Sequence, residues 1–276
     1  ASAASEVGGL LAVGVSALTV SLMGGAELDR WGWRIPFFVG AALAGSVWIA
    51  RTTMHESPEF RRQQYEGTVP DLPIRHAITN HRVGIARGFS ISALGSITYY
   101  VGITYVPAFL NSVGRFSERE SLRLSTIAAV AVIMVTPLIG ALSDRIGRKP
   151  VLIGLCLGSA ALPVTMFSLM AGSAHALLGA VVLAMLAGAV SAVGAVATAE
   201  QFPGEGRITG LALGATMATA VFGGLTPYGA QLLIERTGWP TAPGIMIALV
   251  AVFVLPVLLT LRETAPNARP SRSASS

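Results

Sequence analysis

The chain has 276 residues, of which 53% are hydrophobic and 12% are charged, and it contains 31 glycines. This composition is far from that of a soluble domain of similar length and indicates a membrane protein. The formal net charge of +5 would favour nucleic acid in a soluble chain, but the basic residues here lie between apolar runs as topology signals, so we expect no nucleic-acid partner.

Eight apolar runs have the length of about 20 residues that a helix needs to cross a bilayer. The runs are 5–26, 34–51, 86–110, 122–142, 151–171, 176–199, 208–234 and 243–261. They predict an all-α membrane protein with about eight transmembrane helices. Glu6 is the leading charge of the first run, which is not typical of a signal peptide, and we expect that sequence upstream of the chain is missing.

Polar segments between the runs carry signals for helix starts. In the long segment after the second run, Ser57 followed by Pro58 predicts a short surface helix. Ser117 and Glu120 predict a capping box before the fourth run. The predicted organisation is two helices at 1–51, a linker at 52–83, six helices at 84–262 and a disordered cytoplasmic tail at 263–276.

The third run is less uniformly apolar than its neighbours, because serines, threonines and tyrosines interrupt it. A span of this kind faces other helices or a water-filled cavity on one side. Tyr99, Tyr100 and Tyr105 are therefore candidates for a substrate cavity, where an aromatic face would suit a quaternary ammonium group. Packing between helices is the alternative for these side chains.

A charged loop, ALSDRIGRKP at 141–150, joins the fourth and fifth spans. Thirteen of the 19 Lys and Arg residues lie on the side of the membrane that holds this loop, the linker and the C-terminus. The positive-inside rule places that side in the cytoplasm. Topology does not explain Asp144, which can pair with Arg145 or Arg148 or cap a neighbouring helix.

Several stretches resemble the major facilitator superfamily. GALSDRIGRKP is similar to the cytoplasmic loop signature of that family in its second copy, between helices eight and nine of twelve. Other stretches resemble the metabolite:proton symporter branch of the family, which includes proline/betaine, ketoglutarate, citrate and shikimate transporters. These stretches are WGWRIPFFVG, HESPEF, YYVGITYVPAFL, AEQFPGEGRITGLALG and FGGLTP. The resemblance implies helices five to twelve of a twelve-helix fold, without the first four.

The same resemblance implies candidate residues for conformational change. A cytoplasmic latch would consist of Asp144, Arg145, Gly147, Arg148 and Lys149, with ordinary topology-anchoring charges as the alternative. Glu200 and Arg207 would form a gating pair, or else a static interface pair. Where the family commonly has a Tyr-Asn pair in its eleventh helix, this chain has Ala215 and Thr216, and Thr216 joins the tyrosines as a cavity candidate.

The function implied by the resemblance is secondary transport in the inner membrane, not enzymatic catalysis. We expect a small polar or zwitterionic metabolite or organic acid, moved with protons by alternating access. The expected partners are this substrate, the proton and the lipid bilayer, with no cofactor and no metal. No Asp, Glu, Lys or Arg lies deep in the last six spans, so no proton carrier is assigned.

Two alternatives stay open from the sequence. One is a truncated, non-transporting remnant or membrane interaction partner. The other is a sugar-porter or drug-antiporter type of the same superfamily, since the loop signature is shared across it.

Overall fold

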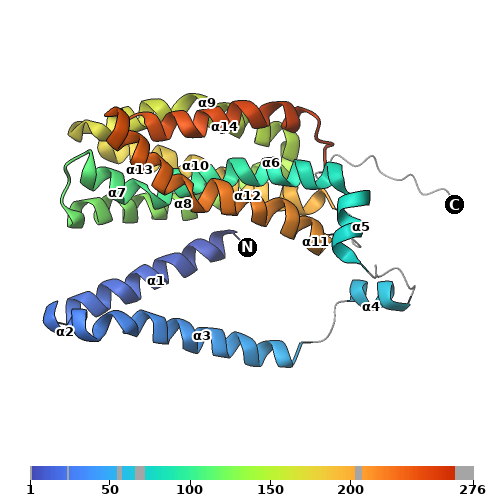
Figure 1. Ribbon diagram of the computed structural model, residues 1–276, viewed down its shortest axis with the longest axis horizontal. Coiled ribbons are helices and arrows are strands. Elements are labelled where there is room, and N and C mark those ends of the chain that lie inside the picture. Colours follow the sequence, from blue (N-terminus) through green and yellow to red (C-terminus); the bar gives the residue numbers. More distant parts are fainter. Residues whose placement is uncertain (1, 24, 55–57, 66–71, 203–206, 265–276) are drawn as a thin grey trace. The chain divides into compact units, whose positions relative to one another are not determined.

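The computed structural model describes residues 2–23, 25–54, 58–65, 72–202 and 207–264. Every regular element within these ranges is a helix (Figure 1), which confirms the predicted all-α class. The chain divides into two compact units, residues 3–69 and residues 70–276, and each is described by itself.

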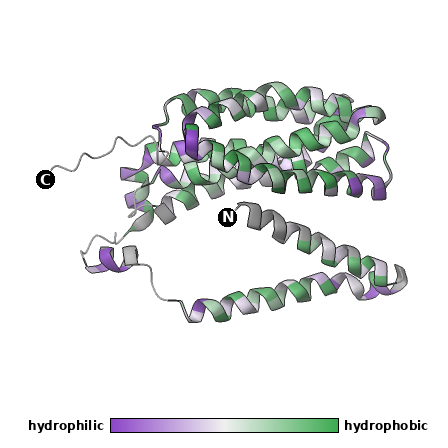
Figure 2. Ribbon diagram, turned by 180° about the vertical axis from the view of Figure 1, so that it is seen from behind, coloured by the Kyte–Doolittle hydropathy of each residue, from purple (hydrophilic) through white to green (hydrophobic). Residues whose placement is uncertain are grey.

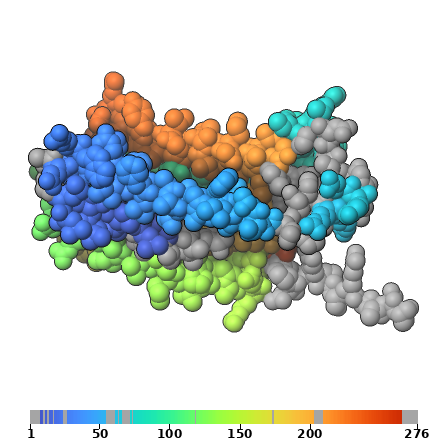
Figure 3. Space-filling view, turned by 90° about the horizontal axis from the view of Figure 1, so that it is seen from below, coloured from blue at the N-terminus to red at the C-terminus, as the bar shows by residue number. Residues whose placement is uncertain are grey.

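The first unit contains two long helices and short connecting elements. Its elements are α1 (Ser2–Leu22), α2 (Gly25–Arg30), the 3₁₀ turn η1 (Gly32–Arg34), α3 (Ile35–Thr52) and α4 (Pro58–Tyr65). None of the described side chains of α3 is buried, and most of its residues are hydrophobic, as its colour in Figure 2 shows. Its side chains project along its whole length (Figure 3). A helix that is apolar all round is suited to a membrane, and Gly32–Thr52 is long and apolar enough to cross one.

The second unit is a helical bundle. Its long helices are α6 (Arg82–Tyr99), α8 (Glu118–Ile146), α9 (Arg148–Ala171), α10 (Ala176–Glu200) and α14 (Ala242–Leu259). Its shorter elements are α5 (Pro73–Asn80), η2 (Tyr100–Thr104), α7 (Val106–Ser112), η3 (Ser173–His175), α11 (Arg207–Leu211), η5 (Ala212–Thr216), α12 (Met217–Thr219), η6 (Ala220–Gly224) and α13 (Thr226–Thr237). The series α6–η2–α7 covers the third predicted run, and the series from α11 to α13 covers the seventh.

The described helices agree closely with the predicted spans. Six of them are long and apolar enough to cross a membrane, or seven if the bent pair Arg82–Thr104 and Val106–Ser112 is one span. These seven match the second to the eighth predicted runs. α1 covers most of the first run but is not among them, so the predicted count of eight is approximate.

α10 lies at the centre of the bundle and packs against α6, α8 and α9, while α14 packs along α9. Most of the buried residues of α10 are alanine, glycine or valine, which lets neighbouring helices approach closely. One cluster of buried apolar side chains includes Phe109 and Phe167, whose rings meet edge to face at 4.9 Å. A second cluster includes Leu152, Val190 and Leu258.

Wider, π-helical turns interrupt two of the spans. At η2 the N–H of Tyr105 donates to the carbonyl of Tyr100, five residues back, at 2.9 Å. The helix then bends by 43° before α7, where Pro107 supplies no backbone donor. The span from α11 to α13 contains two such segments, η5 and η6. The sequence predicted both spans as uninterrupted helices, because hydropathy does not distinguish an α turn from a π turn.

Two predicted helix starts are confirmed. The hydroxyl of Ser117 accepts the N–H of Glu120 at 3.3 Å, and the Glu120 carboxylate accepts the N–H of Ser117 at 3.0 Å, which is the predicted capping box at α8. In the linker, α4 begins at Pro58, and Ser57 lies outside the described residues. The linker also contains α5, which the sequence did not predict.

Candidate functional site

The charged loop between α8 and α9 is a tight turn at Gly147. Its φ of 115° and ψ of 150° lie in a region that is open in practice to glycine alone. A Cβ atom added here would lie 2.9 Å from Cδ of Glu263. The missing side chain therefore lets α8 end and α9 begin within one residue, and it leaves room for an incoming carboxylate.

Arg148 is the centre of the ion pairs at this turn. Its side chain is 10% exposed, and Nη1 lies 2.5 Å from Oδ1 of Asp144, one helical turn earlier. The same Nη1 donates to Oγ of Ser143 at 2.6 Å, and Nε lies 3.6 Å from Oε2 of Glu200 at the end of α10. The structure thus contains the pairing of Asp144 with Arg148, one of those that the sequence left open.

Glu263 caps the start of α9. Its carboxylate accepts the backbone N–H of Arg148 at 2.7 Å and the N–H of Lys149 at 3.1 Å. A carboxylate in this position satisfies N–H groups that have no partner within the helix and meets the positive end of the helix dipole. The sequence offered Asp144 for such a cap, whereas the observed cap comes from a residue 115 positions along the chain from Arg148.

The segment after α14 is bonded to two further helix ends. The hydroxyl of Thr264 donates to the carboxylate of Glu200, and Nη2 of Arg87 on α6 donates to the carbonyl of Thr260 at 2.8 Å. We call the connected polar side chains the end cluster: Ser143, Asp144, Arg148, Glu200, Glu263 and Thr264. The cluster joins the ends of α8, α9 and α10 to the segment that follows α14.

Of the other predicted latch and gating residues, Glu200 belongs to the end cluster. The side chain of Arg145 is exposed, and Lys149 contributes its backbone N–H to Glu263. Glu200 contacts Arg148 and Thr264, while the side chain of Arg207 lies outside the described residues. The gating pair of Glu200 and Arg207 therefore stays a prediction.

A cavity of about 560 Å³ lies between α6, α10 and the series from α11 to α12. Hydroxyl groups form most of its described polar lining: Ser92, Ser96, Ser191, Thr198, Thr216 and Thr219. The hydroxyls of Ser96 and Thr219 hydrogen-bond to each other at 2.9 Å, whereas Oγ1 of Thr198 is buried without a hydrogen bond to any described residue. No charged side chain is among the described lining residues, and no described group of three or more His, Cys, Asp or Glu could hold a metal. This part of the chain offers a ligand neutral hydrogen bonds.

Of the four predicted cavity residues, Thr216 lines this cavity. Tyr105 is 4% exposed in the first apolar cluster, and its hydroxyl donates to Oε1 of Gln231 at 2.6 Å. The rings of Tyr99 and Tyr100 meet edge to face at 5.7 Å. None of the three tyrosines is among the described lining residues, so their contact with a substrate stays a prediction.

Comparison with known proteins identifies close relatives by sequence. The family model described as Major Facilitator Superfamily matches residues 116–276. The chain is 31% identical to a citrate-proton symporter of Klebsiella pneumoniae over 82% of the chain and 51% of that protein. It is 31% identical to an alpha-ketoglutarate permease of Escherichia coli over 95% of the chain and 60% of the permease. A proline/betaine transporter of the same organism is 29% identical, over 98% of the chain and 56% of the transporter.

The chain spans about half the length of the relatives it matches, or slightly more. Among solved structures, a crystal structure of a double tryptophan mutant of XylE superposes with a TM-score of 0.68 over 95% of this chain and 62% of that one. Its sequence identity is 20%, so this likeness concerns the fold alone.

Proposed function

Because this chain belongs to the Major Facilitator Superfamily, we propose that it forms the greater part of a secondary active transporter. The substrate is a small polar or zwitterionic metabolite or an organic acid, moved by alternating access. One observation carries this proposal: relatives named for citrate-proton symport, ketoglutarate permeation and proline/betaine transport align along 82% to 98% of the chain. In transporters of this type, two six-helix halves rock about a central site, and the bundle of the second unit supplies one such half.

Proton symport is the proposed coupling. The name of the citrate-proton symporter supports it. The hydroxyl-lined cavity supports a substrate that this half holds by neutral hydrogen bonds. Charged groups of the substrate would then find their partners outside the described lining.

The end cluster is the proposed latch of this half. Its contact between Arg148 Nε and Glu200, at 3.6 Å, is longer than a hydrogen bond, and would break first if α10 moved relative to α9. The contacts of Glu263 with the start of α9, at 2.7 Å and 3.1 Å, would persist. Asp144→Asn should slow substrate exchange without preventing membrane insertion, and unchanged exchange kinetics would remove the latch from the proposal.

The proposed orientation has the linker and the C-terminus in the cytoplasm. The chain is a multi-pass membrane protein, and thirteen of its 19 Lys and Arg residues belong to this side. The relatives come from bacteria, which supports the inner membrane as its location.

Uptake into proteoliposomes tests the transport proposal. The 276-residue chain is reconstituted, a pH gradient is imposed, and uptake of radiolabelled citrate, ketoglutarate, proline and betaine is measured with and without a protonophore. Gradient-dependent uptake of one of these, or of another organic acid, supports symport. If the chain is helical and cooperatively folded but takes up no organic acid or zwitterion, transport by these 276 residues alone is refuted. A non-transporting remnant or an interaction partner is then the proposal that remains.

A sugar-porter type is the second candidate within transport. Its support is the loop signature at 141–150, which is shared across the superfamily. Uptake of a sugar in the same vesicles, in place of organic acids and zwitterions, would favour it over the symporter branch.

A further inference from the structure

Helix α5 (Pro73–Asn80) connects directly to a membrane-spanning segment. One residue, His81, separates it from α6, and it lies crosswise at the end of the bundle where α6 begins (Figure 1). Ala77 is fully buried, and α5 packs against α11 and the start of α6. The helix is therefore held at the end of a span by one of its faces.

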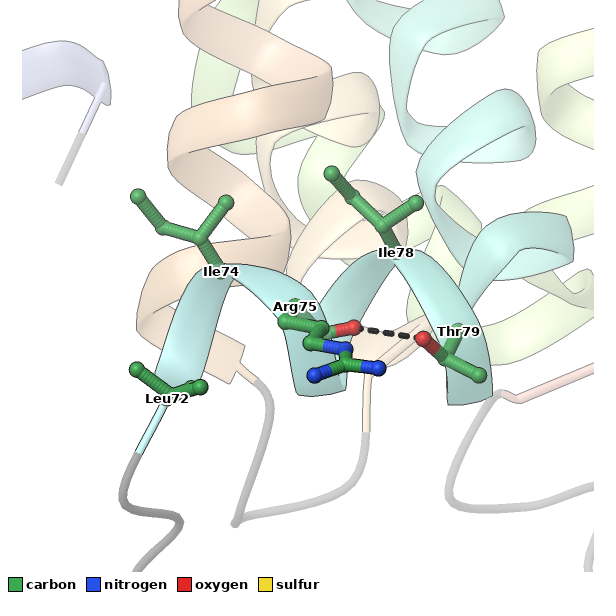
Figure 4. A pocket seen from close by; sticks show the side chains of 5 residues that line it. All are labelled: Leu72, Ile74, Arg75, Ile78 and Thr79. Atoms are coloured by element: carbon green, nitrogen blue, oxygen red, sulfur yellow. Dashed lines mark hydrogen bonds between the residues drawn. The ribbon is translucent and has the colours of Figure 1, made fainter.

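The exposed face of α5 is apolar. Ile74 is 61% exposed and Ile78 is 55% exposed, and Leu72, just before the helix, is 61% exposed. They line an open hollow of about 440 Å³ together with Arg75 and Thr79. Figure 4 shows Ile74 and Ile78 side by side, on the side of α5 from which the long helices rise, and the Arg75 guanidinium pointing away from them. An apolar row with a basic residue beside it fits a helix that lies in a membrane interface.

The charged side chains that the structure describes on α5 and the first two turns of α6 are basic, and Asp71, directly before Leu72, lies outside the described residues. Between Leu72 and Ser117 the sequence contains no Asp or Glu, while Arg75, Arg82 and Arg87 are all basic. The exposed apolar surface continues into α6, where Val83 is 56% exposed. A described surface of isoleucines and arginine is complementary to lipid with an anionic headgroup.

We propose that α5 lies in the bilayer interface, with Ile74 and Ile78 among the acyl chains and the guanidinium of Arg75 on the phosphate of an anionic lipid. Interfacial helices bury their apolar face roughly 5–10 Å into the headgroup and acyl boundary, and an arginine stem crosses that depth while its charge stays at the headgroups. A lipid suits this site better than a protein does, because the site is a short apolar row and a stable protein interface buries about 1,200 Å² or more. The inference requires membrane insertion but not transport.

The chain provides its own background for the test, because Cys156 is its single cysteine. In a Cys156→Ala chain, the variants Ile78→Cys and Asn80→Cys are each labelled with the environment-sensitive fluorophore NBD. Asn80 is the matched control, since it is exposed and lies two residues on, about 200° around the helix. The labelled chains are reconstituted in phosphatidylcholine vesicles with and without phosphatidylglycerol, and quenching is measured with brominated lipids and with iodide.

The proposal expects lipid contact at Ile78. The Ile78 label is quenched by brominated acyl chains and shielded from iodide, and the Asn80 label shows the reverse. Brominated phosphatidylglycerol quenches the Ile78 label at a mole fraction in the vesicle about fivefold lower than brominated phosphatidylcholine does, as expected for one basic residue at an anionic surface. Arg75→Gln abolishes this preference and Arg75→Lys retains it, while Arg123→Gln, which changes an exposed arginine on α8, leaves it unchanged.

Three results would overturn the proposal. Iodide quenching of the Ile78 label to the extent seen at Asn80 would place α5 in water. Shielding from both iodide and brominated lipid would mean that protein covers the face. Equal quenching by the two brominated lipids, unaffected by Arg75→Gln, would remove the anionic headgroup from the site. Transport measurements affect none of these readings, so failure here and failure of the proposed function are separate results.

Discussion

Glu263→Ala should loosen the start of α9. The substitution leaves the N–H groups of Arg148 and Lys149, now bonded at 2.7 Å and 3.1 Å, without their acceptor. Loss of a helix cap costs about 0.5–2 kcal/mol, and loss of a negative charge at a helix N-terminus costs a further 0.3–1 kcal/mol. Because Glu263 is exposed, water replaces part of the lost bonding, and we expect the free energy of local opening to fall by about 1–2 kcal/mol.

Hydrogen exchange of the backbone amides measures this effect directly. A loss of that size corresponds to exchange about 5- to 30-fold faster at Arg148 and Lys149. Glu263→Gln keeps one acceptor oxygen but no charge, so its exchange rates should fall between those of the unchanged chain and those of Glu263→Ala. Glu235→Gln removes an exposed carboxylate from α13 and should leave α9 unchanged. Acceleration of less than about twofold in Glu263→Ala, below the smallest cap effects known, would refute a stabilising role for the cap.

Two further substitutions test the packing of the bundle, both by thermal unfolding in detergent. Gly147→Ala should lower Tm, because a side chain at a φ of 115° costs about 1–3 kcal/mol and meets Glu263. Gly140→Ala is the control and should leave Tm unchanged, because nothing lies within 4 Å of its added Cβ. Equal Tm values for the two variants would contradict the backbone argument. Tyr105→Phe should destabilise the bundle by about 1 kcal/mol through the lost bond to Gln231, and Tyr65→Phe, at a position 92% exposed, is its control. A Tyr105→Phe chain as stable as the control would mean that Gln231 finds another donor.

The helices follow from the sequence because a membrane span has a strong, local signal. Runs of about 20 apolar residues are sufficient to predict such spans, and the capping box at Ser117 is a pattern of four residues. The breaks at η2, η5 and η6 could not be predicted in this way. A π turn replaces one hydrogen-bond pattern by another within the same apolar segment, and packing against neighbouring helices decides between them.

The candidate site was predicted in part. Asp144 and Arg148 lie four residues apart on adjoining helices, so their pairing follows from spacing once the turn is recognised. The sequence contains only a weak indication for Glu263 and Thr264, which are a carboxylate and a hydroxyl just after the last span. Both belong to the predicted tail. Their partners lie 114 or 115 positions away for Glu263 and 64 for Thr264, and distances of this kind come only from tertiary structure.

The π turn at η2 fixes which side of α7 faces inward. A π turn holds one residue more than an α turn, and one residue corresponds to about 100° of rotation around a helix. If each position along 82–112 is labelled or substituted in turn, the helical period of the inward-facing positions should therefore shift by one residue at Thr104. Along 207–237 it should shift twice. Deleting one residue within η2 would restore a regular α-helix and leave α7 on the same face, because the π turn only absorbs the extra residue. Phe109, which is fully buried, would then stay in the core, whereas an unbroken α-helix through the undeleted sequence would rotate it out by about 100°. The wider turn therefore determines the burial of every side chain beyond it.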